Sequence, residues 1–160
     1  MDFEDQLKKA IERGQQRGSA KRATEKAASL SAEDIRNRHN NFRLELSEHI
    51  ESAMRKLENM FPGFEFEIIY GQKGWGGGIS RDDLAKGESG GVSKFYSRLE
   101  IMVRPQNEFN VVNIAGKGTV KNKEMFNWNH FIEVADAKMD EFKKRIDQWI
   151  LQYAENFAAH

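Results

Sequence analysis

The 160-residue chain contains no cysteine, which excludes a disulfide framework, thiolate chemistry and a zinc site built on cysteine. Its 25 lysine and arginine residues equal its 25 aspartate and glutamate residues, so no net field steers it toward nucleic acid or an anionic membrane. It also lacks an apolar run of the length that a membrane span requires. The first five residues are acidic and contain no apolar run, so we expect no signal peptide and a cytoplasmic protein.

The remaining composition is that of a globular, helix-rich protein, with 39% hydrophobic and 31% charged residues. The length suits one domain with a core of its own. We divide the chain at residue 30. Residues 1–30 are predicted to be a loosely held basic helical arm, and residues 31–160 a single α+β domain.

In the arm, Phe3, Leu7 and Ile11 recur at helical spacing before Gly14 and Gly18 interrupt the pattern. A short helix with so few apolar residues is marginal in water, so we expect a solvated, fraying helix. The alternative is a basic tether for a polyanion, because the residues that follow carry four cations and no acid. These cations are Arg13, Arg17, Lys21 and Arg22.

Two long amphipathic helices are predicted outside the arm. Ser31 opens a capping-box-like sequence, and Pro62 and Gly63 end the helix that is predicted over 31–60. This helix is longer than a usual globular helix, so a homo-oligomer through its exposed half is one expected outcome. A second helix, over 136–158, places its apolar residues on one face.

Between the helices, apolar and polar residues alternate, as is typical of strands with one buried face. We predict strands over 64–70, 95–103, 109–115 and 119–126, with turns at 105–107 and 116–118. The second turn stays open, since one bulged strand over 109–126 fits as well. The sequence thus predicts a two-layer α+β sandwich. It has a long N-terminal helix, an antiparallel four-stranded meander and a long C-terminal helix packed on one sheet face.

The segment 71–91 holds eight of the thirteen glycines and lies between two predicted strands. So much glycine indicates a loop that is free to adopt positive φ or to approach a partner closely, although a mobile surface loop explains it as well. It carries neither a P-loop nor a dinucleotide fingerprint. Tryptophan is enriched at interface hot spots, which favours a contact there. The predicted partner or ligand contacts are Lys73, Gly74, Trp75, Gly76, Gly77, Gly78 and Arg81.

The sequence gives little support for metal binding or for catalysis. Glu45 and His49 have the i, i+4 spacing of two ligands, but no third ligand is evident. Cross-strand ion pairs explain Glu65, Glu67 and Glu100. We therefore predict no metal, no cofactor and no catalytic residue, and we lean against an enzyme.

A cluster of cations forms the last functional pattern. Lys117, Lys121 and Lys123 lie close together near the second predicted turn, and with the arm's cations they are the predicted polyanion contacts. The neutral net charge and the lack of an RNP-like aromatic motif argue against nucleic acid.

Three hypotheses follow, in this order. The first is a non-enzymatic protein-interaction or assembly module that acts through an unknown protein partner. The alternative is a nucleic-acid or polyanion binder that uses the arm and the 117–123 hairpin. The second alternative is a small-ligand domain with the glycine-rich loop as a lid.

Overall fold

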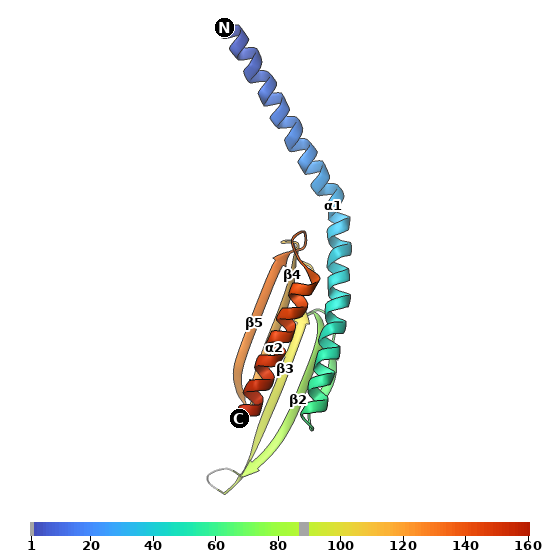
Figure 1. Ribbon diagram of the computed structural model, residues 1–160, viewed down its shortest axis with the longest axis vertical. Coiled ribbons are helices and arrows are strands. Elements are labelled where there is room, and N and C mark those ends of the chain that lie inside the picture. The colour runs from blue at the N-terminus through green and yellow to red at the C-terminus, as the bar shows by residue number, and fades with distance from the viewer. Residues whose placement is uncertain (1, 87–89) are drawn as a thin grey trace. The chain divides into compact units, whose positions relative to one another are not determined.

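The structure is a computed structural model that describes residues 2–86 and 90–160, and for residues 24–31 it describes the backbone alone. The chain forms two compact units, Met1–Asn37 and Arg38–His160. The elements, shown in Figure 1, are α1 (Phe3–Met60), β1 (Glu65–Ile69), β2 (Trp75–Lys86), β3 (Val92–Val103), β4 (Val111–Val120), β5 (Lys123–Glu133) and α2 (Met139–Ala159).

Helix α1 begins at Phe3 because Asp2 caps it: the Asp2 Oδ1 atom accepts the backbone N–H of Asp5 at 2.9 Å. The helical backbone then continues through Ser31, so the predicted helix start at that residue is wrong. Residues 19–35 contain five alanines and neither glycine nor proline. Because alanine is the best helix former, this stretch favours continuation over a new start.

The sheet is a five-stranded antiparallel meander in the order β1-β2-β3-β4-β5. Helices precede and follow it in the described chain. The predicted α+β class and antiparallel meander are therefore confirmed. The predicted number of four strands is corrected to five.

The additional strand is β2, which occupies residues 75–86 of the predicted glycine-rich loop. The loop prediction is therefore wrong for these residues, while residues 87–89 lie outside the described chain. Close packing is the reason for the glycines. A Cβ atom on Gly76 would overlap the carbonyl oxygen of Ile101, and a Cβ atom on Gly77 would lie 2.8 Å from the Phe66 ring.

Strands β4 and β5 form a hairpin, so the alternative of one bulged strand over 109–126 is wrong. Its turn is at Lys121 and Asn122, and not at 116–118, which lies inside β4. Both turn residues have positive φ, 46° and 72°, as a two-residue type I′ hairpin requires. The Asn122 side chain also accepts the backbone N–H of Tyr96 at 2.8 Å, which ties the turn to β3.

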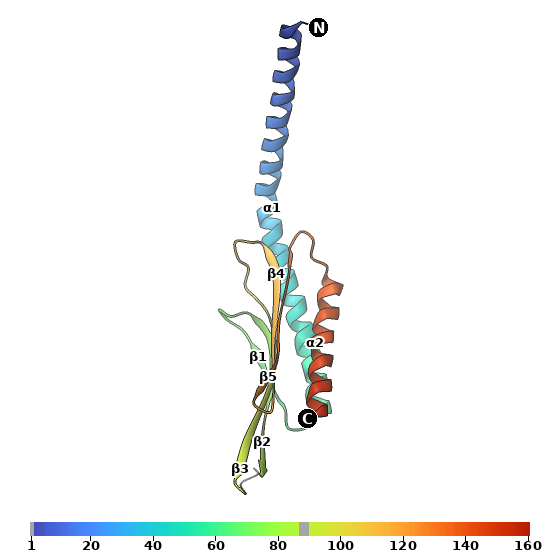
Figure 2. The same ribbon diagram turned by 90° about the vertical axis from the view of Figure 1, so that its left-hand side faces the viewer.

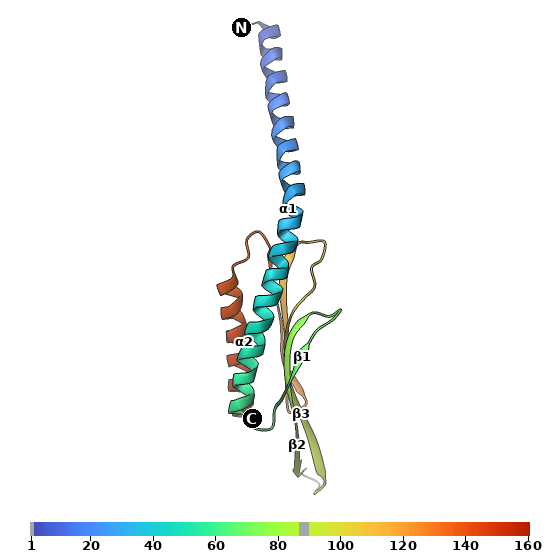
Figure 3. The same ribbon diagram turned by 90° about the vertical axis from the view of Figure 1, so that its right-hand side faces the viewer.

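Within Arg38–His160, α1 and α2 lie side by side on one face of the sheet, as the nearly edge-on view in Figure 2 and the opposite view in Figure 3 show. The rings of Phe42 and Phe142 meet edge to face at 5.8 Å. The Nε2 atom of His49 lies 2.7 Å from Asp147 Oδ1. The apolar stripe of the 31–60 helix packs into this core through Phe42, Leu46, Ile50, Met54 and Leu57, which are buried. A homo-oligomer through this helix stays a prediction.

Aromatic side chains of β5 fill the core beneath α2. The ring of Trp128 stacks on that of Trp149 at 5.2 Å, and Phe126 packs against Tyr153 at 6.5 Å. The segment 126–131 is therefore part of a strand, and not the connection between strand and helix that its composition suggests. Alternation explains this, since Phe126 and Trp128 face the helices while Asn127 and Asn129 do not.

Candidate functional site

The sheet face opposite α1 and α2, called here the helix-free face, carries no helix among the described residues of Arg38–His160 (Figure 2). Leu99 and Ile101 are fully buried beneath the helices. Because successive strand residues point to opposite faces, Glu100 between them points to the helix-free face. The register aligns it with Glu67, Gly78, Lys117 and Asn127 in one row across all five strands.

An ion-pair cluster occupies one part of this face. The Arg98 guanidinium lies 2.6 Å from Glu67 and 3.3 Å from Glu100. It crosses β2 at Gly78, where a Cβ atom would lie 2.9 Å from the Arg98 Nη2 atom. Burial alone lowers the pKa of Arg98, but the hydrogen bond and charge of Glu67, together with Glu100 and Tyr96, raise it above its ordinary value. Partners within the sheet therefore satisfy this charge.

Most of the predicted contact residues in segment 71–81 are buried or contact other residues of the same domain. Trp75 is half-buried, with the Arg43 guanidinium carbon 4.5 Å above its ring. Arg81 bonds Asp83 Oδ1 at 2.8 Å. Lys73 is exposed, and its carbonyl oxygen accepts a bond from Arg104. The glycines of this set, Gly74, Gly76, Gly77 and Gly78, are buried. A contact role for these residues remains a prediction.

The predicted polyanion contacts fall into two sets, one in each unit. In Arg38–His160, Lys117 pairs with Glu124 at 3.4 Å, and the Lys121 ammonium bonds the backbone oxygen of His160. Lys123 is the first residue of β5 and is exposed. In Met1–Asn37, the predicted contacts are exposed residues of α1, namely Arg13, Arg17, Lys21 and Arg22.

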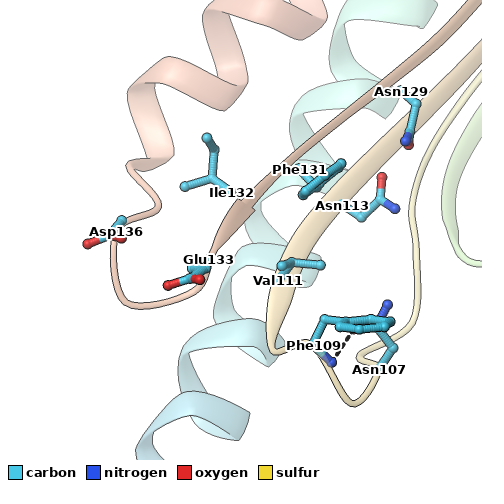
Figure 4. Close-up of a pocket in the computed structure, with 9 residues that line it drawn as sticks. All are labelled: Asn107, Phe109, Val111, Asn113, Asn129, Phe131, Ile132, Glu133 and Asp136. Carbon is cyan, nitrogen blue, oxygen red and sulfur yellow. Dashed lines mark hydrogen bonds between the residues drawn. The ribbon is translucent and has the colours of Figure 1, made fainter.

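An open groove of about 770 Å³ lies at the end of the helix-free face where β4 starts and β5 ends. Phe109 precedes β4, and Phe131 lies on β5 opposite Asn113. The two phenyl rings border the groove (Figure 4) and are 70% and 58% exposed. We call it the Phe109–Phe131 groove. It is lined by Asn107, Phe109, Val111, Asn113, Asn129, Phe131, Ile132, Glu133 and Asp136.

The polar groups of the groove are amides and carboxylates. Asn107 holds the loop before β4, since its Oδ1 atom accepts the backbone N–H of Phe109 at 3.0 Å. The Oδ1 atom of Asn113 is buried and has no hydrogen-bond partner among the described residues. Glu133 and Asp136 are the only charged residues among those that line the groove.

The residue types that line the groove limit the chemistry it can offer. The described residues of the lining include no serine, threonine, histidine, lysine or tyrosine. Among the described residues, no three histidine, aspartate or glutamate side chains come together in a group that could hold a metal ion. Neither helix, over its described residues, combines the length and apolar character needed to cross a bilayer.

No protein family, no curated protein and no solved structure matches this chain. The fold and the groove therefore rest on the residues of the chain itself.

The groove was not predicted from the sequence, although one residue of β5 indicates it. In β5, residues 126, 128 and 130 face the helices, whereas 127 and 129 are asparagines. Phe131 is thus a large apolar residue at a position where alternation predicts a polar one. Phe109 gives no comparable signal, because it lies outside the alternating pattern of β4, which begins at Val111.

Proposed function

We propose that Arg38–His160 is a non-enzymatic protein-interaction module that binds a protein partner through the Phe109–Phe131 groove. The observation that carries this proposal is the exposure of two phenylalanine rings, 70% and 58%, at the border of one groove. Aromatic residues beside a concave apolar surface are the usual anchors of protein interfaces.

The energetics favour occupation of the groove. Burying a phenylalanine side chain contributes roughly 1.5–3 kcal/mol relative to leaving it in water. Phe109 and Phe131 line the same groove, so one partner segment that fills the groove can cover both. Clustered exposed apolar surface typically marks an interaction site. Two such rings supply an anchor, while the surrounding sheet supplies a rigid frame.

The chemistry of the lining indicates what kind of partner segment fits. Glu133 and Asp136 favour a lysine or arginine side chain on the partner. The partner segment that fits best therefore presents an apolar side chain next to a basic one. A polyanion fits this groove poorly, because both charged groups in its lining are acidic.

Affinity capture from the native lysate tests the proposal, with the full chain as bait. The wild-type chain is expected to recover one protein stoichiometrically, and the double variant Phe109→Ser/Phe131→Ser is expected to lose it. The matched control is Leu84→Ser/Val92→Ser, which removes two residues that are 75% and 73% exposed near the other end of the sheet. Equal recovery by all three baits would contradict the proposal, and loss on nuclease treatment would favour the polyanion hypothesis.

A small apolar ligand is the second candidate, because the groove volume of about 770 Å³ falls within the range of ligand pockets. The glycine-rich segment plays no part as a lid in this candidate, since it forms β2. A ligand screen by thermal shift distinguishes a small ligand from a protein partner. A compound that raises the Tm of the wild type and not that of Phe131→Ser would support the ligand.

A further inference from the structure

The N-terminal part of α1 carries apolar side chains that are exposed. All residues from 2 to 23 are exposed except the half-buried Gly18. Phe3, Leu7 and Ile11 are 74%, 48% and 53% exposed. A helix that presents apolar residues to water on this scale depends on a partner for its stability. We call residues 2–22 the arm helix.

The apolar residues form one continuous stripe. At 3.6 residues per turn, Phe3, Leu7 and Ile11 lie within about 80° of one another around the helix. Gly14 and Gly18 continue the same stripe, with Gly14 between Phe3 and Leu7 in azimuth and Gly18 between Leu7 and Ile11. One face of the arm helix therefore has large apolar residues in its first half and glycines in its second half.

No contact among the described residues requires these two glycines. A Cβ atom on Gly14 would meet no atom within 4 Å, and one on Gly18 would meet only the Arg22 guanidinium, at 3.7 Å. Glycine in a helix interior is less favourable than alanine. In β2 and β4 the glycines lie where a Cβ atom would clash, whereas here the clash is missing. Close approach of another helix accounts for their position on the stripe.

The charges show which helix fits. The first turn is acidic, with Asp2, Glu4 and Asp5, whereas residues 13–22 carry four cations and no acid. A second arm helix in parallel orientation would place acid against acid and cation against cation. In antiparallel orientation the acidic turn of each copy meets the basic half of the other.

We propose that the arm helix pairs with the arm helix of a second copy of this chain in antiparallel orientation. In this pairing Leu7 of each copy packs on Gly18 of the other, and Ile11 packs on Gly14. The same register places Glu4 beside Lys21 and Arg22. Large residues thus enter the hollows that the glycines leave, and the acidic turn faces the cations. The pairing involves none of the groove residues, so it is independent of the proposed function of Arg38–His160.

Sedimentation equilibrium of the full chain is the first test. The wild type is expected to be a dimer that dissociates on dilution, and Leu7→Asp is expected to weaken the dimer by at least tenfold. The matched control is Gln16→Asp, which adds the same charge on the opposite side of the arm helix and is expected to leave the dimer intact. A wild-type chain that is monomeric at all concentrations would overturn the proposal.

A glycine variant separates docking from helix formation. Gly14→Leu/Gly18→Leu is expected to increase the helix content seen by circular dichroism, because leucine is the better helix former. It is also expected to abolish the dimer, because the hollows are filled. Tighter dimerisation of this variant would show that the glycines are not contact positions, and would overturn the proposed packing.

The orientation is tested by disulfide formation, for which the cysteine-free chain gives a clean background. In the antiparallel pair, a mixture of Glu4→Cys and Arg22→Cys is expected to form the mixed disulfide, while each variant alone stays reduced. Efficient disulfides within each variant alone would indicate the parallel pairing. That result would overturn the proposal.

Discussion

The indole rings of Trp128 on β5 and Trp149 on α2 stack at 5.2 Å with 6° between their planes. Gly116 of β4 lies beside this pair, and a Cβ atom there would be 2.8 Å from Trp128 and 3.2 Å from Trp149. The stack therefore requires the glycine. It also fixes α2 over the last two strands, whose start and end form the groove.

Gly116→Ala is expected to destabilise the chain by about 1–3 kcal/mol, as overpacking in a close-packed core does. The added methyl group must displace one of the two indole rings. Urea unfolding monitored by tryptophan fluorescence measures the change. The control is Gly91→Ala, where a Cβ atom would meet nothing within 4 Å. Equal stability of the two variants would contradict the packing described here.

Tyr153 connects α2 to β4 by a buried hydrogen bond, which its hydroxyl donates to the Thr119 carbonyl at 2.8 Å. Tyr153→Phe is expected to cost about 0.5–1.5 kcal/mol. Burial, and to a lesser extent the charge of Tyr96, raises the pKa of Tyr153 above its ordinary value. The unfolded chain therefore loses this proton first, so stability falls as the pH rises through about 10. The phenylalanine variant is expected to lose part of that alkaline dependence in urea titrations.

His39 of α1 is 2% exposed, and its Nε2 atom has no hydrogen-bond partner among the described residues. Burial, and secondly the charge of Arg43, lowers the pKa of His39 below 6.5. On acidification the unfolded chain therefore binds this proton at a higher pH than the folded chain does. The free energy of unfolding decreases as the pH falls below about 6.5. Burial also lowers the pKa of His130, with Arg145 adding to the effect while Glu141 opposes it, and this adds to the same trend.

His39→Leu tests this effect. At pH 7 the variant is expected to be at least as stable as the wild type, because a buried polar atom without a partner costs about 1–3 kcal/mol. Between pH 7 and pH 5 it is expected to lose less stability than the wild type. The control His160→Gln changes an exposed histidine, and it should retain the full dependence. A variant with unchanged acid sensitivity would show that His39 is not responsible.

The groove variants are expected to separate binding from folding. Phe109→Ser and Phe131→Ser each remove an exposed ring, so the free energy of unfolding should change by less than about 0.5 kcal/mol. A loss of several kcal/mol on either substitution would mean that the ring supports the fold. The loss of a partner would then have no bearing on the groove.

Alternation and helical periodicity were sufficient to predict most of the fold. They indicated β1 and the greater part of β3, and they placed α2 within three residues of its start, because one buried face imposes a strict period on these segments. Strand β2 was missed because its first half consists of glycines, which carry no periodicity. The clash that requires Gly77 becomes visible only with the Phe66 ring in place.

The turn and the groove were harder to predict for related reasons. Gly116 and Gly118 resemble turn residues, yet they lie in β4 because rings from β5 and α2 pack on them. The true turn uses Lys121 and Asn122, and lysine seldom adopts positive φ. The groove combines residues from the loop before β4 and from the end of β5, so its existence depends on the register of these strands.

Site-specific photo-cross-linking tests the proposed function most directly. Benzoylphenylalanine is introduced in the full chain in place of Phe131, and as a control in place of Leu84, which is 75% exposed away from the groove. The proposal predicts one discrete cross-linked protein from position 131, abolished by Phe109→Ser, and none from position 84. Cross-links from position 84 alone, or equal cross-linking from both positions, would contradict it.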